Sequence, residues 1–181
     1  KKSANRTWIE NGKIGEGEGR GGVYLLGHSR GGGISILKAN EDDRIKKIVT
    51  WSAVCDFESR LPKDGARFKK EGVVYVPNAR TNQQMPLYYQ FFEDFCQNKQ
   101  RLDIPTAVKG MNIPQLLIHG TDDEAVPVEE AKKMKQWNPD AELLLIEGAG
   151  HTFGAKHPYP DEDLPGDAQR VVEASVEFFL K

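Results

Sequence analysis

Apolar residues gather in short runs along this chain, and turn-forming residues separate each run from the next. Largely apolar runs of strand length are typical of strands buried on both faces of a sheet. Such runs occupy 23–26, 47–54, 115–119 and 142–146. Segments compatible with helices alternate with them, over 30–40, 128–137 and 168–180. This alternation predicts an α/β fold in which helices flank a mainly parallel sheet.

The stretch 57–111 interrupts the alternation. It contains a candidate hairpin, with a strand over 73–76 and a turn around 78–82, and an aromatic-rich candidate helix over 87–95. Insertions between core strands commonly form lids or walls of substrate pockets. A second small core that supports the sheet is an equal alternative. We therefore expect one α/β domain over 1–181 that carries a lid-like or cap insertion at 57–111.

Composition and charge narrow the function classes. At 181 residues, the chain has the length of one domain. A formal net charge of −2 provides no basic surface for nucleic acid or an anionic membrane. No apolar run approaches the ~18 residues that span a bilayer. The polar residues 1–6 indicate no compartment, and the glycine-rich residues 10–22 predict a surface loop.

Metal and disulfide chemistry are both disfavoured by the spacing of the candidate ligands. The four histidines and the acids near them show no H-x-x-x-H or similar pattern, so we expect no metal site. Two cysteines are too few for a disulfide scaffold at this length. We expect Cys55 and Cys96 to be buried free thiols, because free cysteine packs as a small hydrophobe.

A candidate nucleophile lies where the first apolar run meets the first predicted helix. Residues 27–31 match G-x-S-x-G, a pattern that is weak alone but fits a strand-to-helix turn. The backbone of Ser29 would be strained there, and bulky neighbours would clash, which explains the glycines. The Arg30 N–H would face a developing oxyanion at the positive end of the helix. The alternatives are an incidental serine or a phosphate-binding loop, but the pattern G-x-x-x-x-G-K-[ST] is absent.

The acid and the base that would serve Ser29 should follow later strands. A serine becomes a useful nucleophile when a histidine takes its proton and a carboxylate orients that histidine. On a parallel sheet the order along the chain is serine, acid, histidine. The third apolar run leads into three adjacent acids, and the fourth leads into His151. Spacing and the pattern G-x-x-D-x-x-V-P favour Asp123 as the acid, with Asp122 stabilising the turn.

The other histidines have different expected roles. We expect His28, next to the candidate nucleophile, to pack under the turn. His119 lies at a strand end, where a structural hydrogen bond is the simpler role. His157 lies in a proline-containing loop and is the second choice for the base. His151 is preferred because the small residues around it let its loop approach the serine.

Taken together, these segments resemble the α/β-hydrolase superfamily, from its fifth core strand to the C-terminus. The likeness is greatest to its dienelactone-hydrolase and prolyl-oligopeptidase-like branches, including bacterial feruloyl or cinnamoyl esterases. The segments that carry it are 27–32, 119–127 and 148–151. The resemblance implies a serine esterase that needs no cofactor, with a catalytic triad of Ser29 at a nucleophile elbow, Asp123 and His151. The Arg30 N–H is then the oxyanion donor.

Members of this superfamily carry about four further strands before the nucleophile, and a loop there supplies a second oxyanion N–H. We expect this N-terminal half in a longer form of the same protein or on a second chain. Without it, the strand at 23–26 is a bare edge. The implied reaction is hydrolysis of a small-molecule carboxylic ester through an acyl-enzyme. The alternatives are a serine peptidase of the prolyl-oligopeptidase-like type and a non-catalytic binding domain that retains the fold.

Overall fold

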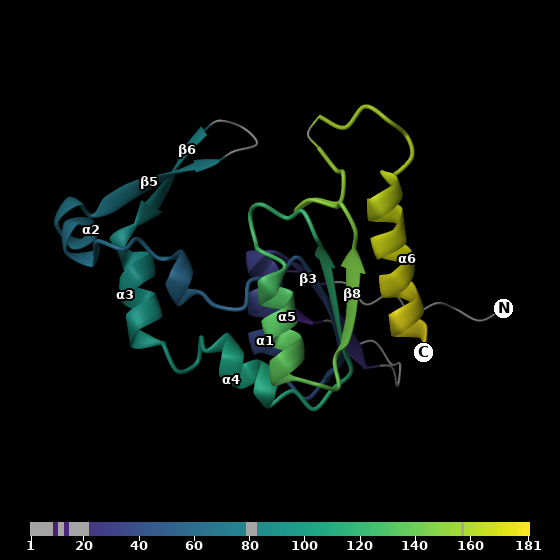
Figure 1. The fold of residues 1–181 in the computed structure, drawn as a ribbon. Coiled ribbons are helices and arrows are strands. Elements are labelled where there is room, and N and C mark those ends of the chain that lie inside the picture. The colour runs from purple at the N-terminus through teal and green to yellow at the C-terminus, as the bar shows by residue number, and fades with distance from the viewer. Residues whose placement is uncertain (1–8, 11–12, 15–21, 79–82, 157) are drawn as a thin grey trace.

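The computed structural model of the protein describes residues 9–10, 13–14, 22–78, 83–156 and 158–181. Its centre is a parallel sheet of four strands, which lie side by side in their order along the chain (Figure 1). The strands are β3 (Val23–His28), β4 (Ile45–Trp51), β7 (Gln115–Gly120) and β8 (Glu142–Ile146). Every residue of β7 is buried, as expected for an inner strand covered on both faces.

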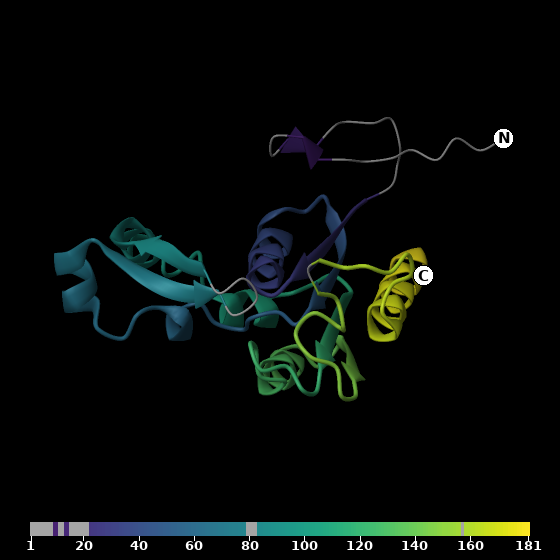
Figure 2. The same ribbon diagram turned by 90° about the horizontal axis from the view of Figure 1, so that it is seen from above.

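Helices cover both faces of the sheet, which confirms the predicted α/β architecture (Figures 1 and 2). Three helices pack on one face: α1 (Arg30–Glu41), α4 (Ile104–Lys109) and α5 (Glu129–Trp137). The C-terminal helix α6 (Gly166–Leu180) packs on the opposite face. The three predicted helices are confirmed, and their ends differ from the predicted ones by at most two residues. The short α4 was not predicted.

Two hydrophobic cores hold these layers together. On one face, Ile36, Ile104 and Met134 bring α1, α4 and α5 into a single cluster with the sheet. On the other face, Val171 and Phe178 of α6 pack on the inner strands. Burying a side chain of this size contributes about 1.5–3 kcal/mol. The two cores fix the carboxyl ends of the parallel strands at one edge of the sheet.

The strand β4 ends earlier than the apolar pattern suggests. We predicted a strand over 47–54, whereas β4 covers Ile45–Trp51. Ser52 has a φ of 45°, which lies outside the β region, and its N–H donates to the Ile118 carbonyl at 2.8 Å. The next three residues are buried although they belong to no strand. The continuous apolar run therefore concealed a turn.

The insertion projects beyond one side of the sheet (Figures 1 and 2). Before α4 it comprises the 3₁₀ turn η1 (Glu58–Arg60), α2 (Gly65–Glu71), β5 (Val73–Asn78), β6 (Gln83–Tyr88) and α3 (Tyr89–Gln97). The strands β5 and β6 pair antiparallel, so the hairpin is present, while most of its predicted turn lies outside the described residues. The helix predicted from residue 87 begins at Tyr89, because the two residues before it pair with β5.

The insertion has an aromatic cluster of its own. The ring of Phe68 on α2 meets those of Tyr89 and Phe92 on α3 edge-on, with centroids 5.4 and 6.2 Å away. Edge-to-face pairs at this spacing are favourable beyond the area they bury. This cluster holds α2 and α3 together. Whether the insertion serves as a lid or as a structural support stays a prediction.

The strand β3 forms one edge of the sheet within the described part of the chain, as expected for the run at 23–26. Its Tyr24 and Leu26 are 44% and 43% exposed. Upstream of it, two short strands pair antiparallel, β1 (Ile9–Glu10) and β2 (Lys13–Ile14). The strand β2 and the last residue of β1 fall within the surface loop predicted over 10–22, so short strands occur where a loop was predicted. The rest of that loop, apart from Gly22, lies outside the described residues.

The two cysteines are free, but only one of them is buried. Cys55 is buried, and this burial, together with the charge of Glu130, raises the pKa of its thiol to about 12. Cys96 on α3 is exposed, so the prediction that both thiols are buried is wrong for this residue. Its neighbour Phe95 occupies the buried face of the helix instead. Among the described helices, none is long and apolar enough to cross a bilayer.

Candidate active site

Ser29 occupies a sharp turn between β3 and α1. Its backbone has φ 57° and ψ −125°, a conformation that non-glycine residues seldom adopt and that costs of the order of 1–3 kcal/mol. The turn is held by the Ser29 N–H, which donates to the Trp51 carbonyl of β4 at 2.8 Å. From the other side, the Gly32 N–H donates to the Ser29 carbonyl at 3.0 Å. The strained conformation predicted from the G-x-S-x-G pattern is therefore present.

Only one of the two glycines that flank this turn is required by packing. A methyl group on Gly27 would lie 2.4 Å from Ser35 Oγ and 2.5 Å from the Gly31 carbonyl oxygen. A methyl group on Gly31 would meet no described atom within 4 Å beyond its chain neighbours and the adjacent backbone of its own helix. The sequence-based argument that bulky neighbours would clash thus holds at Gly27 and fails at Gly31.

We expect Gly27→Ala to lower the free energy of unfolding by about 1–3 kcal/mol, because the added methyl forces the start of α1 away from β3. Gly31→Ala is the matched control. In a helix, alanine is more favourable than glycine by about 1 kcal/mol, so this variant should be as stable as the natural protein or more stable. Urea unfolding of both variants measures the difference. Equal losses in the two variants would contradict the packing argument.

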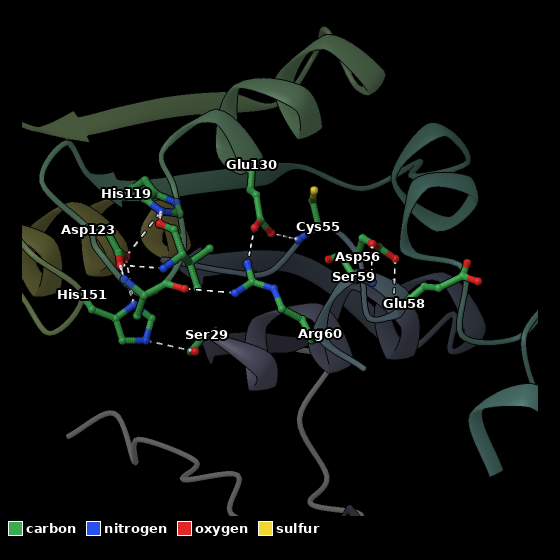
Figure 3. A network of polar contacts seen from close by, with 12 residues as sticks. Ser29, Cys55, Asp56, Glu58, Ser59, Arg60, His119, Asp123, Glu130 and His151 are labelled. Carbon is green, nitrogen blue, oxygen red and sulfur yellow. Dashed lines mark hydrogen bonds and ion pairs between the residues drawn. The ribbon is translucent and has the colours of Figure 1, made fainter. Parts of the chain in front are cut away.

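A close contact between two loops brings His151 to the end of the sheet. Gly120 ends β7, and a methyl group there would lie 2.1 Å from the Ala149 carbonyl oxygen. The absence of a side chain lets the loop after β8 lie directly on the loop after β7. The Asp122 N–H donates to the same Ala149 carbonyl at 3.0 Å. His151 follows this contact and points toward the turn that carries Ser29 (Figure 3).

The structure brings the three predicted side chains into one line of hydrogen bonds (Figure 3). The Nε2 of His151 lies 3.0 Å from Ser29 Oγ. Its Nδ1 lies 2.8 Å from Asp123 Oδ2 and 3.1 Å from Oδ1. The carboxylate is fully buried, while the imidazole is 20% exposed. A hydroxyl, an imidazole and a carboxylate at these distances can pass a proton from Ser29 to His151 while Asp123 stabilises the imidazolium.

The carboxylate of Asp123 is held in its charged form. The N–H groups of Ala125 and Val126 donate to Oδ1 at 2.9 and 2.8 Å. Burial alone would raise the pKa of Asp123, but the hydrogen bonds from Val126 and His151 outweigh it and hold the pKa below its usual range. The neighbouring Asp122 is exposed and accepts a hydrogen bond from Thr121 Oγ1 at 3.2 Å, consistent with a role in the turn.

Two further histidines lie close to this line of contacts. The Nε2 of His119 is within 2.8 Å of the Val126 carbonyl oxygen and 3.4 Å of Asp123 Oδ2, so the expected structural hydrogen bond is present. His28 was expected to pack under the turn. Its ring instead lies beside that of His151, with the centroids 4.6 Å apart, and its Nε2 is 2.8 Å from the His151 carbonyl oxygen. The alternative base, His157, lies outside the described residues.

Arg30 links the turn to the insertion. It is the first residue of α1, where a backbone N–H has no partner within the helix and the helix dipole is positive. Its guanidinium lies over the ring of Phe91 on α3, 5.3 Å from the centroid. Phe91 is 39% exposed. The insertion therefore reaches the residue next to Ser29.

Some residues around the site had no signal in the sequence analysis. Arg60 and Glu130 form an ion pair beside the loop that carries Asp123 (Figure 3). They are distant in sequence and belong to no recognised motif, so only their contacts identify them. No cluster of His, Cys, Asp and Glu in the described ranges has the arrangement to hold a metal ion.

Comparison with a curated protein agrees with this architecture. The chain is 25% identical over 163 residues to a 2-hydroxy-6-oxo-6-(2'-aminophenyl)hexa-2,4-dienoic acid hydrolase of Metapseudomonas resinovorans. The match covers 76% of this chain and 56% of that protein, so the chain spans about half the length of this curated relative.

Solved structures and a family model point to the same fold. A monoacylglycerol lipase of Paleococcus ferrophilus has 20% identity and a TM-score of 0.63, over 88% of this chain and 68% of that one. The esterase domain of a Rhodothermus marinus protein has 19% identity and a TM-score of 0.55, over 87% of this chain and 59% of that one. At these identities the likeness shows the fold alone. The model of the alpha/beta hydrolase fold family matches residues 58–158, and the chain therefore belongs to that family.

Proposed function

We propose that the protein is a serine hydrolase that cleaves a carboxylic ester through an acyl-enzyme intermediate. The observation that carries the proposal is the continuous hydrogen-bonded line from Ser29 through His151 to Asp123. The strained backbone of Ser29 also supports the proposal, because strained residues of this kind cluster at active sites, where the surrounding structure holds them in place. The fold family and its esterase and lipase neighbours are consistent with a hydrolase.

The first half of the proposed reaction forms the acyl-enzyme. Ser29 Oγ attacks the ester carbonyl carbon as its proton passes to His151 Nε2, and the carbonyl oxygen becomes an oxyanion. Asp123 accepts the hydrogen bond from Nδ1 and balances the charge of the imidazolium. The tetrahedral intermediate then collapses. The bond to the alcohol oxygen breaks, and His151 returns the proton to that oxygen.

The second half uses the same groups on water. A water molecule attacks the acyl carbon while His151 takes a proton from that water. The bond to Ser29 Oγ then breaks, Ser29 regains its proton from His151, and the carboxylic acid leaves. In both halves the Arg30 N–H, at the positive end of α1, is positioned to stabilise the oxyanion. We propose that a second donor comes from an N-terminal part of the same protein or from a second chain.

The insertion supports a substrate with an apolar or aromatic acyl group. Its α3 carries Phe91, which is partly exposed and stacks with the guanidinium of Arg30 beside the proposed nucleophile. A partly exposed ring near the reacting centre offers apolar contact area to a small ester. In this proposal the insertion at 57–111 forms one wall of the substrate site.

A fluorophosphonate probe on the full-length protein tests the proposal. Such probes react with serines that an adjacent base activates, so we expect labelling of Ser29 and its loss in Ser29→Ala. Ser59→Ala is the matched control, because Ser59 is exposed and its backbone N–H donates to Asp56, so this variant should still be labelled. An unlabelled natural protein would favour a binding domain that retains the fold.

Substrate panels then separate the remaining reactions. We expect turnover of p-nitrophenyl esters, with aromatic or apolar acyl groups preferred over acetyl. Aminoacyl p-nitroanilides distinguish a peptidase that uses the same groups. Faster turnover of the anilides than of the esters would contradict the proposed ester specificity and leave the serine mechanism intact.

A further inference from the structure

Arg60 stands at the base of the insertion and contacts the loop that carries the proposed acid (Figure 3). It is the last residue of η1, and its guanidinium is partly buried, with 28% of the side chain exposed. Its Nη1 donates to the Ala125 carbonyl at 3.0 Å. The Ala125 carbonyl belongs to the peptide unit that joins residues 125 and 126. Arg60 therefore binds one side of a peptide unit two residues beyond Asp123.

The other side of that peptide unit holds the carboxylate. The N–H of Val126 donates to Asp123 Oδ1 at 2.8 Å. A charged donor on a carbonyl polarises the peptide and strengthens the hydrogen bond that its N–H makes. The line of contacts from Ser29 through His151 to Asp123 is thus extended through the 125–126 peptide to a guanidinium. A hydrogen bond joins the peptide to Asp123 on one side and to Arg60 on the other.

Glu130 fixes the guanidinium in place. Glu130 lies on α5. Its Oε1 accepts a hydrogen bond from Arg60 Nη2, and its Oε2 accepts one from the Cys55 N–H at 2.8 Å. The side chain of Glu130 is 14% exposed, so salt screens its ion pair with Arg60 less than it screens a pair on the open surface. The segment that carries Cys55 also reaches the turn at the nucleophile, because the Val54 N–H donates to the Ser29 carbonyl at 3.3 Å.

We infer that Arg60 is a positioning residue for Asp123: through the 125–126 peptide it sets the direction of the carboxylate and thereby the orientation of His151. This inference rests on the proposed function. Because Arg60 belongs to the insertion, the segment that forms one wall of the proposed substrate site also supports the acid. The Arg60 side chain therefore couples the attachment of the insertion to the orientation of Asp123 and His151.

The test compares Arg60→Gln, Arg60→Lys and Arg67→Gln in the full-length protein with a p-nitrophenyl ester. We expect Arg60→Gln to lower kcat roughly 10-fold, because a displaced acid disturbs the geometry of the proton transfer, with KM changed less than about 2-fold. Arg60→Lys retains a charged donor and should recover part of the loss. Arg67→Gln is the matched control. Arg67 lies in the same insertion, its side chain is 70% exposed and pairs with Glu71, and its variant should match the natural protein.

A second pair of variants tests whether Arg60 and Glu130 act through one contact. Glu130→Gln removes the charge that orients Arg60 and should lower kcat in the same direction. The double variant Arg60→Gln/Glu130→Gln should be no slower than the slower single variant, because both act through one contact. Multiplicative losses, a rise in KM at constant kcat, or an unchanged kcat in Arg60→Gln would each overturn the inference.

The outcome for Arg60 is distinguishable from the outcome for the proposed function. If the natural protein is labelled by the fluorophosphonate at Ser29 and Arg60→Gln turns over the ester at the natural rate, the positioning role alone fails. If the natural protein neither reacts with the probe nor cleaves esters, both the proposed function and the role of Arg60 are contradicted.

Discussion

Replacing Ser29 by alanine is expected to lower kcat/KM for a p-nitrophenyl ester by roughly 10⁴- to 10⁶-fold in the full-length protein. The imidazole of His151 is 3.0 Å from Ser29 Oγ, and in the proposed mechanism this hydroxyl is the nucleophile that His151 activates to form the acyl-enzyme. Without the hydroxyl, the oxyanion donor and substrate binding remain, and they supply only part of the acceleration, about 10³- to 10⁴-fold over water. Initial rates at several substrate concentrations measure the loss. A variant within 10-fold of the natural protein would exclude Ser29 as the nucleophile.

Ser29→Gly separates lost chemistry from lost structure. Glycine adopts a positive φ without strain, whereas alanine does not. Ser29→Gly should therefore be as inactive as Ser29→Ala but more stable than Ser29→Ala by about 1 kcal/mol. Thermal unfolding of the two variants measures the difference. An inactive protein of raised stability would show that the natural side chain is retained at a cost to the fold. A less stable Ser29→Gly would contradict the strain argument.

Asp123→Asn is expected to lower kcat by about 10⁴-fold while the protein stays folded. The amide keeps the size of the side chain but cannot accept the Nδ1–H of His151 as a carboxylate does, so the imidazole loses its orientation and its counter-charge. Steady-state rates with the same ester measure the effect. Asp122→Asn is the matched control, because Asp122 is exposed and contacts Thr121 rather than His151. Equal losses in the two variants would contradict the assignment of the acid.

The pH dependence of stability provides an independent check on Asp123. Hydrogen bonds from Val126 and His151 hold the pKa of this carboxyl below its usual range in the folded protein. Its ionised form therefore stabilises the fold at pH values above about 4, and this contribution is lost as the pH falls through the lower, folded pKa. We expect Asp123→Asn to be less stable than the natural protein at neutral pH and the gap in Tm to narrow below about pH 4. A gap that widens on acidification would mean that the pKa is raised.

Local patterns predict the bounds of most strands and helices. The predicted bounds are wrong where a tertiary contact ends an element early. The run at 115–119 predicted β7 almost to the residue, because an inner parallel strand must be apolar on both faces. The same rule overextended β4, since Ser52 leaves the strand at a positive φ while the residues after it remain buried. The six residues of α4 were too few to display a helical period. The prediction that Cys96 is buried is wrong, because Cys96 lies on the exposed face of its helix.

The α/β class and the three residues of the proposed proton relay could be predicted from patterns that are local or ordered along the chain, together with the family pattern that selects Asp123 among three adjacent acids. Apolar runs must be buried, and a serine between a strand and a helix must take a turn. That Ser29, His151 and Asp123 meet within hydrogen-bond distance is known only from the folded structure. The folded structure alone also placed His28 beside His151 and Arg60 on the loop of Asp123. These contacts join residues far apart in the chain through single hydrogen bonds, and a contact of that kind leaves no periodicity or spacing by which a sequence can reveal it.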